Sequence, residues 1–326
     1  MKNLLFTGGG GAGSEALYRL MGADYHTHFA DADIAAKPYS IPGNRWHQVP
    51  FASESQFVDR VRDLCFDLKI DLLIPAVDEE LLSLAQARAT LGCEVLLPPT
   101  EFVSSHLDKF TSNQVLQVHG IPVPKTEMLS GRRTISFPCI VKPRKGRGSR
   151  GVTVVQSDQE LQAYLVMSRR QAREFVVQEL LIGQEYTVMM AADRGGRLCA
   201  IVPVRVDIKR GITLRAETSK DELVIAACQA IHAAQPVPGC YNIQLVKDNM
   251  GQVMPFEINP RISTTACLGL TAGVNFIDVF LEGDKRINRG ETGLMPFRAS
   301  LGLRRSWHNE FVDRNPADSV TALSAP

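Results

Sequence analysis

The length, composition and charge of the chain are those of an ordinary globular protein. It has 326 residues, of which 44% are hydrophobic and 22% charged, and a formal net charge of +1; this length is enough for two or three packed units. A net charge so close to zero does not point to a nucleic-acid or membrane partner. The seven cysteines form no CxxC pair and no apolar run is long enough to span a bilayer, so we expect a cytoplasmic chain with reduced thiols.

The N-terminal third predicts alternating strands and helices. NLLFTG (3–8) is typical of a short buried strand, and a glycine-rich turn leads from it into a helix. A second helix follows, and DLLIP (71–75) then returns as a strand. This β/α pattern predicts a parallel sheet with near-Rossmann topology. The apolar positions that indicate the two helices are Ala16, Leu17, Leu20, Val58, Val61, Cys65 and Leu68.

The turn after the first strand contains glycines at the spacing of a dinucleotide-binding fingerprint. Gly8, Gly10 and Gly13 fit GxGxxG, and Asp31 or Asp33 has the place of an acid that would bind a ribose. Spacing alone therefore leaves a nicotinamide site open. The N-terminus of the following helix could instead attract an anionic group of a substrate.

A basic, glycine-rich loop follows in the middle of the chain. The run PCIVKPRKGRGSRGVTVV (138–155) indicates a strand ending at Lys142, outside the core, then the loop and a second strand. Glycines let backbone N–H groups turn inward around phosphate oxygens, although the same pattern alone is more typical of a solvated turn. It is not a Walker A sequence, because a strand follows the loop. The glycines and basic residues of the loop are Arg144, Lys145, Gly146, Arg147, Gly148, Arg150 and Gly151.

Two helices and several longer strands are expected around the remaining motifs. One helix is predicted near 157–168 and another near 219–234, with longer strands from 185 to 209. The apolar residues expected to face the core are Leu161 and Leu165 in the first helix and Leu223, Ala227 and Ile231 in the second.

The segment 241–265 brings an acid, an amide and an arginine to one face of a strand. Side chains alternate along a strand, so Glu257, Asn259 and Arg261 share a face, and Gln244 lies on what reads as the adjacent strand. Magnesium prefers oxygen ligands and arginine grips phosphate, so this set predicts a site for a cation and a polyphosphate. The alternative is a simple ion pair between Glu257 and Arg261. A proline on each side of the motif argues against an ordinary central strand.

Taken together, these motifs resemble the ATP-grasp superfamily, and are most similar to the carbamoyl-phosphate synthase large-chain branch of carboxylate–amine ligases. The resemblance covers most of the chain and depends on several motifs in the same order. The motifs are LLIPAVDEELLSLA (72–85), DKFTSNQVLQVHGIPVPKT (108–126), FPCIVKP (137–143), VVQELLIGQEYTV (176–188) and EINPR (257–261).

The resemblance implies an α/β and α+β fold in three parts. A Rossmann-like parallel-sheet domain (1–106) would precede a two-lobed ATP-grasp fold (107–283), and a C-terminal extension of the large lobe and a frayed tail would follow (284–326). The small lobe would span about 137–183 and the large lobe about 184–283, with ATP between them. In this family the N-terminal domain generally holds no NAD, so we expect no nicotinamide role.

The resemblance also assigns roles to individual residues. Arg261 would face the γ-phosphate as a catalytic residue together with Glu257 and Asn259. The candidates for binding a substrate carboxylate are Arg205, Arg210 and Arg215, with solvated strand arginines as the alternative. The expected ligands of Mg²⁺ or Mn²⁺ are Glu257, Asn259 and, more weakly, Gln244. The residues expected to bind ATP are Lys109, Lys142, Gly146, Arg147, Gly148, Ser149, Glu179, Leu180, Leu181 and Glu185.

The implied activity is that of a carboxylate–amine, or carboxylate–thiol, ligase acting on small molecules through an acyl phosphate, with release of ADP and phosphate. No nucleophilic serine, cysteine or histidine is needed for this chemistry, because phosphoryl transfer depends on positioning and charge. Two alternatives stay open: a carboxylate or carbamate kinase, and a nucleotide-binding module without ligase activity. Whether the chain forms a homodimer is also left open.

Overall fold

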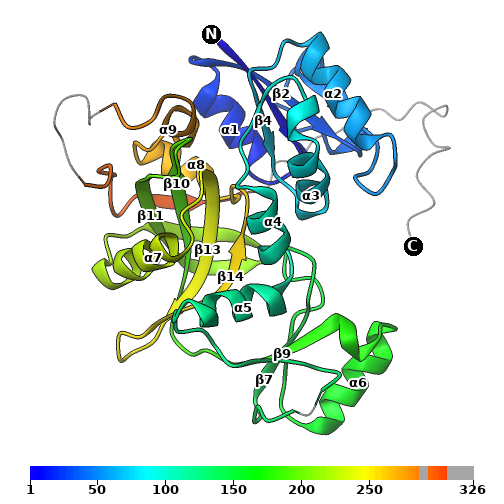
Figure 1. The fold of residues 1–326 in the computed structure, drawn as a ribbon, viewed down its shortest axis with the longest axis vertical. Helices are drawn as coiled ribbons and strands as arrows, with labels where there is room; N and C mark the ends of the chain where they lie inside the picture. The colour runs from blue at the N-terminus through cyan, green and yellow to red at the C-terminus, as the bar shows by residue number, and fades with distance from the viewer. Residues whose placement is uncertain (132, 286–292, 307–326) are drawn as a thin grey trace.

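The computed structural model describes residues 1–131, 133–285 and 293–306. Three β-sheets organise this part of the chain: a five-stranded sheet near the N-terminus, a four-stranded sheet and a six-stranded sheet. In Figure 1 the five-stranded sheet lies at the top, the four-stranded sheet at the bottom beside α6, and the six-stranded sheet between them. The fold class expected from the sequence, a parallel-sheet domain followed by a two-lobed ATP-grasp fold, is confirmed.

The N-terminal sheet is parallel throughout, with the strand order β3-β2-β1-β4-β5. Such sheets are covered on both faces, so their strands are apolar runs, and Leu4, Leu5 and Phe6 are fully or almost fully buried. The strands are β1 (Lys2–Thr7), β2 (Tyr25–Asp31), β3 (Trp46–Gln48), β4 (Leu72–Pro75) and β5 (Glu94–Val95). The helices are α1 (Ser14–Met21), α2 (Phe57–Asp67), α3 (Asp78–Gln86) and α4 (Thr100–His106), with short 3₁₀ helices at Ile34–Ala36, Gly43–Arg45 and Arg88–Thr90.

The four-stranded sheet forms a small lobe with a core of its own. Its order is β6-β9-β7-β8, and every pair is antiparallel. Helix α6 covers it and buries Leu161, as expected, with Leu165 packed against the same core. The elements are β6 (Thr126–Met128), β7 (Cys139–Pro143), β8 (Thr153–Val155), α6 (Asp158–Ser168), a 3₁₀ helix (Ala172–Glu174) and β9 (Phe175–Glu179).

The six-stranded sheet is antiparallel in the order β14-β13-β10-β11-β12-β15. One hydrophobic core joins its strands β10, β11 and β13 to the N-terminal sheet. The strands are β10 (Gln184–Ala192), β11 (Leu198–Arg210), β12 (Ile212–Thr218), β13 (Gly239–Lys247), β14 (Val253–Asn259) and β15 (Gly302–Arg304). The helices that accompany it are α5 (Lys109–Val118), α7 (Glu222–Ala234), α8 (Ala266–Thr271) and α9 (Phe276–Glu282).

Strand β14 shows why prolines flank the polar motif. It is an edge strand, where a residue without an N–H donor is tolerated. Gln244 is opposite Glu257 while Leu245 is opposite Pro255, so Phe256 is the extra residue of a bulge. The bulge lies directly before the polar positions, and such irregularities are common beside functional sites.

Two helix faces differ from the expectation. In α1, Leu17 and Met21 are buried but Leu20 is exposed. In α7, Val224, Cys228 and Ile231 are buried, whereas Leu223 is 52% exposed. Apolar residues surround α7 on several sides, so the pattern of hydrophobicity alone does not identify the face that packs against the sheet.

No helix in residues 1–131, 133–285 and 293–306 is both long enough and apolar enough to cross a membrane. The predicted frayed tail, NPADSVTALSAP, lies outside the described residues.

Candidate nucleotide-binding site

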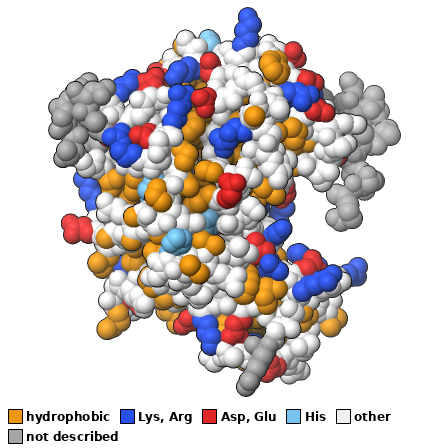
Figure 2. All heavy atoms as spheres, in the orientation of Figure 1, with side chains coloured by type: hydrophobic (Ala, Val, Ile, Leu, Met, Phe, Trp, Pro, Cys, Tyr) orange, Lys and Arg blue, Asp and Glu red, His pale blue; other side chains and the backbone are white. Residues whose placement is uncertain are grey.

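One cavity of about 610 Å³ collects residues from all three sheets. Its volume is in the range of small-molecule sites. The loop between β7 and β8, the segment joining the small lobe to β10, and strands β11, β13 and β14 all line it, together with the β1–α1 and β4–α3 turns. In Figure 2 the outline of the molecule is indented on the right, between the N-terminal part and the small lobe. We call the cavity defined by these lining residues the central cavity.

Lys142, near the end of β7, is a buried polar group of the central cavity. It is 4% exposed, so the expectation that it lies outside the core is wrong. Its ammonium donates to Gln178 Oε1 at 2.8 Å and to the carbonyl of Phe256, the bulge residue of β14, at 3.4 Å. Burial lowers the pKa of Lys142 to about 8, against the opposing effect of Glu257.

Lys109, in the first turn of α5, reaches the same space from the other side. Its ammonium donates to the carbonyl of Gly146 at 2.7 Å and lies 3.4 Å from Glu257 Oε1. Gly146 and Gly148 have φ of 121° and 66°, values that favour glycine. The glycines of the basic loop are therefore needed for its path over the central cavity.

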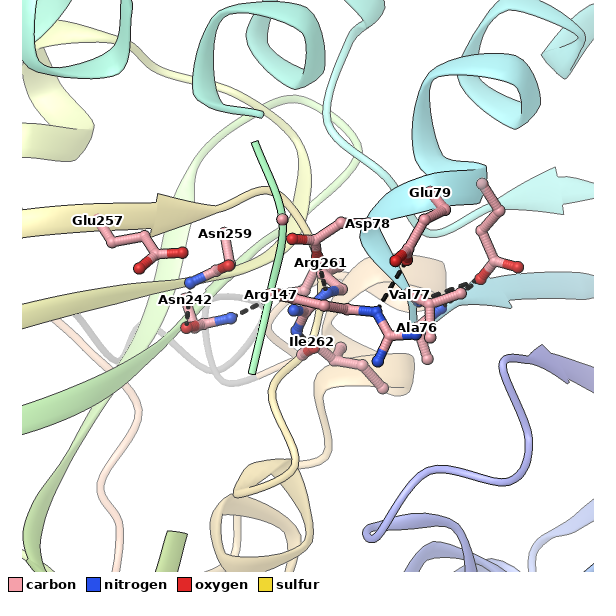
Figure 3. Close-up of polar contacts among 12 residues, drawn as sticks. Ala76, Val77, Asp78, Glu79, Arg147, Asn242, Glu257, Asn259, Arg261 and Ile262 are labelled. Carbon is pink, nitrogen blue, oxygen red and sulfur yellow. Dashed lines mark hydrogen bonds and ion pairs between the residues drawn. The ribbon is translucent and has the colours of Figure 1, made fainter. Parts of the chain in front are cut away.

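Glu257 and Asn259 project from β14 beside each other (Figure 3). Burial alone would raise the pKa of Glu257, but the charge of Lys109, followed by that of Lys142 and other nearby cations, holds it below its ordinary value. Asn259 Nδ2 donates to Asn242 Oδ1 at 3.4 Å, and Asn242 Nδ2 donates to the carbonyl of Arg261 at 3.0 Å. Because Asn259 uses its amide nitrogen in this pair, its oxygen can act as a ligand.

This donor set fits a hard cation held partly by a substrate. An ionised carboxylate and an amide oxygen are ligands that Mg²⁺ accepts, and Mg²⁺ often completes its shell with phosphate oxygens and water. No group of three or more His, Cys, Asp or Glu side chains in the described ranges could hold a metal ion by itself. Glu257 and Asn259 would therefore hold the cation together with phosphate.

Two arginines of the central cavity are tied to consecutive acids at the start of α3 (Figure 3). Arg261 Nε donates to Asp78 Oδ1 at 2.6 Å, and Arg147 Nε donates to Glu79 Oε2 at 2.8 Å. Arg261 also donates to the carbonyl of Ile262 at 3.0 Å. The N-terminal domain thus orients one arginine from the segment that follows β14 and one from the basic loop.

The β1–α1 turn lines the central cavity, and one of the two acids considered for a dinucleotide ribose is hydrogen-bonded to it. The carboxylate of Asp31 accepts a hydrogen bond from the Gly10 N–H at 2.8 Å, so this acid secures the turn. Gly8 has φ of 64°, and a Cβ there would lie 2.6 Å from Val77 Cγ1. Close packing against the β4–α3 turn therefore accounts for a glycine at this position.

Most of the residues predicted from the sequence meet in the central cavity, but a few do not line it. Leu180 and the three arginines considered for a substrate carboxylate are absent from its lining; Arg210 is exposed and its neighbour Lys209 lies inside. The predicted residues that the structure brings together are Lys109, Lys142, Gly146, Arg147, Gly148, Ser149, Glu179, Leu181, Glu185, Gln244, Glu257, Asn259 and Arg261.

Several residues that shape the site were not predicted from the sequence. Lys209, Gln178 and Asn242 line it, and Asp78 and Glu79 orient its arginines. Asn242 could have been predicted, because it lies two residues before Gln244 on the same strand and its side chain therefore points to the same face.

Comparisons with known proteins agree with this geometry. Residues 171–301 match the family model "ATP-grasp in the biosynthetic pathway with Ter operon" and residues 103–189 match "Carbamoyl-phosphate synthase L chain, ATP binding domain". The carbamoyl phosphate synthase large chain of Mycobacterium tuberculosis is 27% identical over 214 residues. That match covers 56% of this chain but only 18% of the relative's length.

Solved structures share the fold at low sequence identity. An L-amino acid ligase from Bacillus licheniformis matches with a TM-score of 0.66 and 19% identity, covering 86% of this chain and 73% of that one. N5-carboxyaminoimidazole synthetase from Staphylococcus aureus, complexed with ADP, matches with a TM-score of 0.69 and 12% identity, covering 93% of each chain.

Proposed function

Because the chain belongs to the ATP-grasp superfamily, we propose that it is an ATP-dependent ligase that joins a carboxylate to an amine on small molecules through an acyl phosphate. The observation that carries the proposal is the meeting of Lys109, Lys142 and Arg261 with Glu257 and Asn259 in one cavity. Cations and metal-binding oxygens in that arrangement suit a polyphosphate and its metal.

The nucleotide would extend across the central cavity from an apolar end to a charged end. Leu181 and Phe256 line the first, where an adenine would pack, and Glu185 would accept hydrogen bonds from the ribose. Lys109 and Lys142 would bind the phosphates below the basic loop. Glu257 and Asn259 would hold Mg²⁺ or Mn²⁺, which supplies positive charge to the phosphate oxygens.

The chemistry needs positioning more than a protein nucleophile. A substrate carboxylate oxygen would attack the γ-phosphorus, the bond to the β-phosphate oxygen would break, and ADP would leave. An amine would then attack the acyl carbon and lose a proton, and phosphate would depart with one of the original carboxylate oxygens. Arg261, held by Asp78, is placed to stabilise the charge on the transferring group.

The experiment that tests this function is a screen for ADP release with carboxylic acids, alone and paired with amines or thiols. With the correct acid, hydroxylamine should trap a hydroxamate, and ¹⁸O in the acid should appear in the released phosphate. A phosphorylated acid that accumulates instead would show a kinase. Failure to bind ATP would contradict the proposal.

A variant ties the result to the site. Glu257→Gln keeps the shape of the side chain and removes its charge, so turnover should fall by about two orders of magnitude. Glu222→Gln, in the exposed first turn of α7, is the matched control and should leave turnover unchanged. Full activity in Glu257→Gln would contradict the assignment.

A further inference from the structure

Lys209 occupies a position that the family resemblance did not assign. It lies near the end of β11, and its ammonium forms an ion pair with Glu185 on β10. It also donates to Gln244 Oε1 on β13 at 3.1 Å. All three side chains line the central cavity. Lys209 is therefore held between the acid proposed for the ribose and an amide proposed for the metal.

The ammonium of Lys209 shares its surroundings with Lys142. Both lysines lie close to the Phe256 ring, whose centre is 5.4 Å from Lys142 Nζ and 5.9 Å from Lys209 Nζ. Lys142 extends from the small lobe and Lys209 from the large lobe. A polyphosphate between the lobes would thus meet a lysine on each side.

The hydrogen bonds of Lys209 limit what Gln244 can do. An ammonium has three N–H donors, so after Glu185 and Gln244 one donor is left for a phosphate oxygen. A divalent cation bound to Gln244 Oε1 at about 2.1 Å would lie within roughly 5 Å of the ammonium. Two positive charges at that distance in a partly buried site repel each other strongly.

We propose that Lys209 is a third phosphate-binding lysine and stands in for one divalent cation, so that ATP is bound with a single divalent cation, held by Glu257 and Asn259. The inference rests on the proposed function, because it requires that the central cavity binds ATP. It gives Gln244 the role of orienting Lys209 and not that of a metal ligand.

The test counts Mn²⁺ ions by electron paramagnetic resonance in the presence of a non-hydrolysable ATP analogue. The intact chain should bind one Mn²⁺ per nucleotide. Lys209→Ala should bind the analogue about tenfold more weakly at low Mn²⁺, as expected for the loss of a charged hydrogen bond, and should regain affinity at high Mn²⁺ as a second ion binds. Lys220→Ala removes an exposed lysine that does not line the central cavity; it is the matched control and should behave like the intact chain.

A second variant keeps the test decisive if Lys209→Ala does not fold. Gln244→Leu should still bind one Mn²⁺ per nucleotide, because the amide is not a ligand. Two ions in the intact chain, or loss of Mn²⁺ in Gln244→Leu, would overturn the inference while leaving the proposed function intact. No binding of the analogue by the intact chain, with or without Mn²⁺, would overturn both.

Discussion

At the scale of single residues, the lowered pKa of Lys142 leads us to expect that nucleotide binding depends on pH. Burial lowers its pKa to about 8, and a bound polyphosphate would favour the charged form and raise that pKa. Above pH 8, binding must therefore take up a proton, and affinity should fall about fivefold between pH 8 and pH 9. Calorimetry in buffers of different ionisation enthalpy measures the uptake.

Two substitutions separate Lys142 from its neighbours. Lys142→Arg keeps its charge through this range, so its nucleotide affinity should vary little with pH. Lys145→Arg, in the exposed part of the loop, should retain the dependence of the intact chain. Binding at pH 8.5 without proton uptake would show that Lys142 is not charged by the nucleotide.

We expect the loss of the Asp78 charge to lower turnover more than it weakens ATP binding. Its carboxylate orients Arg261 through a bond of 2.6 Å, and the two side chains are only 12% and 13% exposed. Asp78→Asn keeps the shape and removes the charge, so turnover should fall about tenfold. Nucleotide affinity, measured by calorimetry, should change by less than about threefold, because the lysines remain.

A comparison with another ion pair tests whether this effect is specific. Glu94→Gln breaks the ion pair between Glu94 and Arg194, which is far more exposed than the pair between Asp78 and Arg261. This substitution should leave turnover unchanged. If Asp78→Asn weakened nucleotide binding as much as turnover, Arg261 would act on the bound nucleotide generally and not on the transferring group.

At the scale of elements, the first turn of α3 carries a buried acid. Glu80 Oε1 accepts hydrogen bonds from the Thr7 hydroxyl at 2.8 Å and from the Ala76 and Val77 N–H groups at 2.9 and 3.1 Å. Burial raises its pKa from 4.5 to about 7, although these hydrogen bonds oppose the rise. The β4–α3 turn is therefore secured by a carboxyl group that is largely protonated below neutral pH.

This raised pKa predicts that stability decreases with rising pH. Between pH 4.5 and pH 7 the folded chain binds a proton at Glu80 that the unfolded chain has lost, so the free energy of unfolding falls across this range, by roughly 3 kcal/mol at most. Urea unfolding at pH 5 and pH 7 should show a smaller decrease for Glu80→Gln. The exposed Glu101→Gln should unfold like the intact chain, and an equal decrease in Glu80→Gln would contradict the assignment.

The elements also show how far the sequence could predict the site. Alternation along β14 was sufficient to place Glu257 and Asn259 on one face, because the strand is regular there. On β11 the register shifts around Ile208, so simple alternation along the strand does not show that Lys209 lines the cavity. Bulges have no clear sequence signal, and the contacts of Arg261 depend on how a separate sheet packs.

At the scale of the whole molecule, the central cavity is the place where the three sheets meet. The small lobe has its own core, and the ion pair between Arg147 and Glu79 ties its basic loop to the N-terminal domain. These side chains are 33% and 51% exposed, and pairs of this kind contribute under about 1 kcal/mol. By comparison, a ligand at a hundred times its Kd stabilises the protein by about 2.7 kcal/mol.

These magnitudes predict that the ion pair affects the loop in the free protein but not in the nucleotide complex. Glu79→Gln removes the pair without changing any trypsin site, so cleavage after the basic residues of the loop should be faster than in the intact chain. Saturating ATP analogue should then protect both proteins to the same extent, since the ligand contributes more than the pair. Glu94→Gln, which breaks a similarly exposed pair elsewhere, should leave cleavage of the loop unchanged.

If the loop of Glu79→Gln were cleaved at the rate of the intact chain without ligand, Glu79 would not hold the loop. If the analogue failed to protect Glu79→Gln alone, the pair would be required for closure, and the three sheets would depend on it to assemble the site.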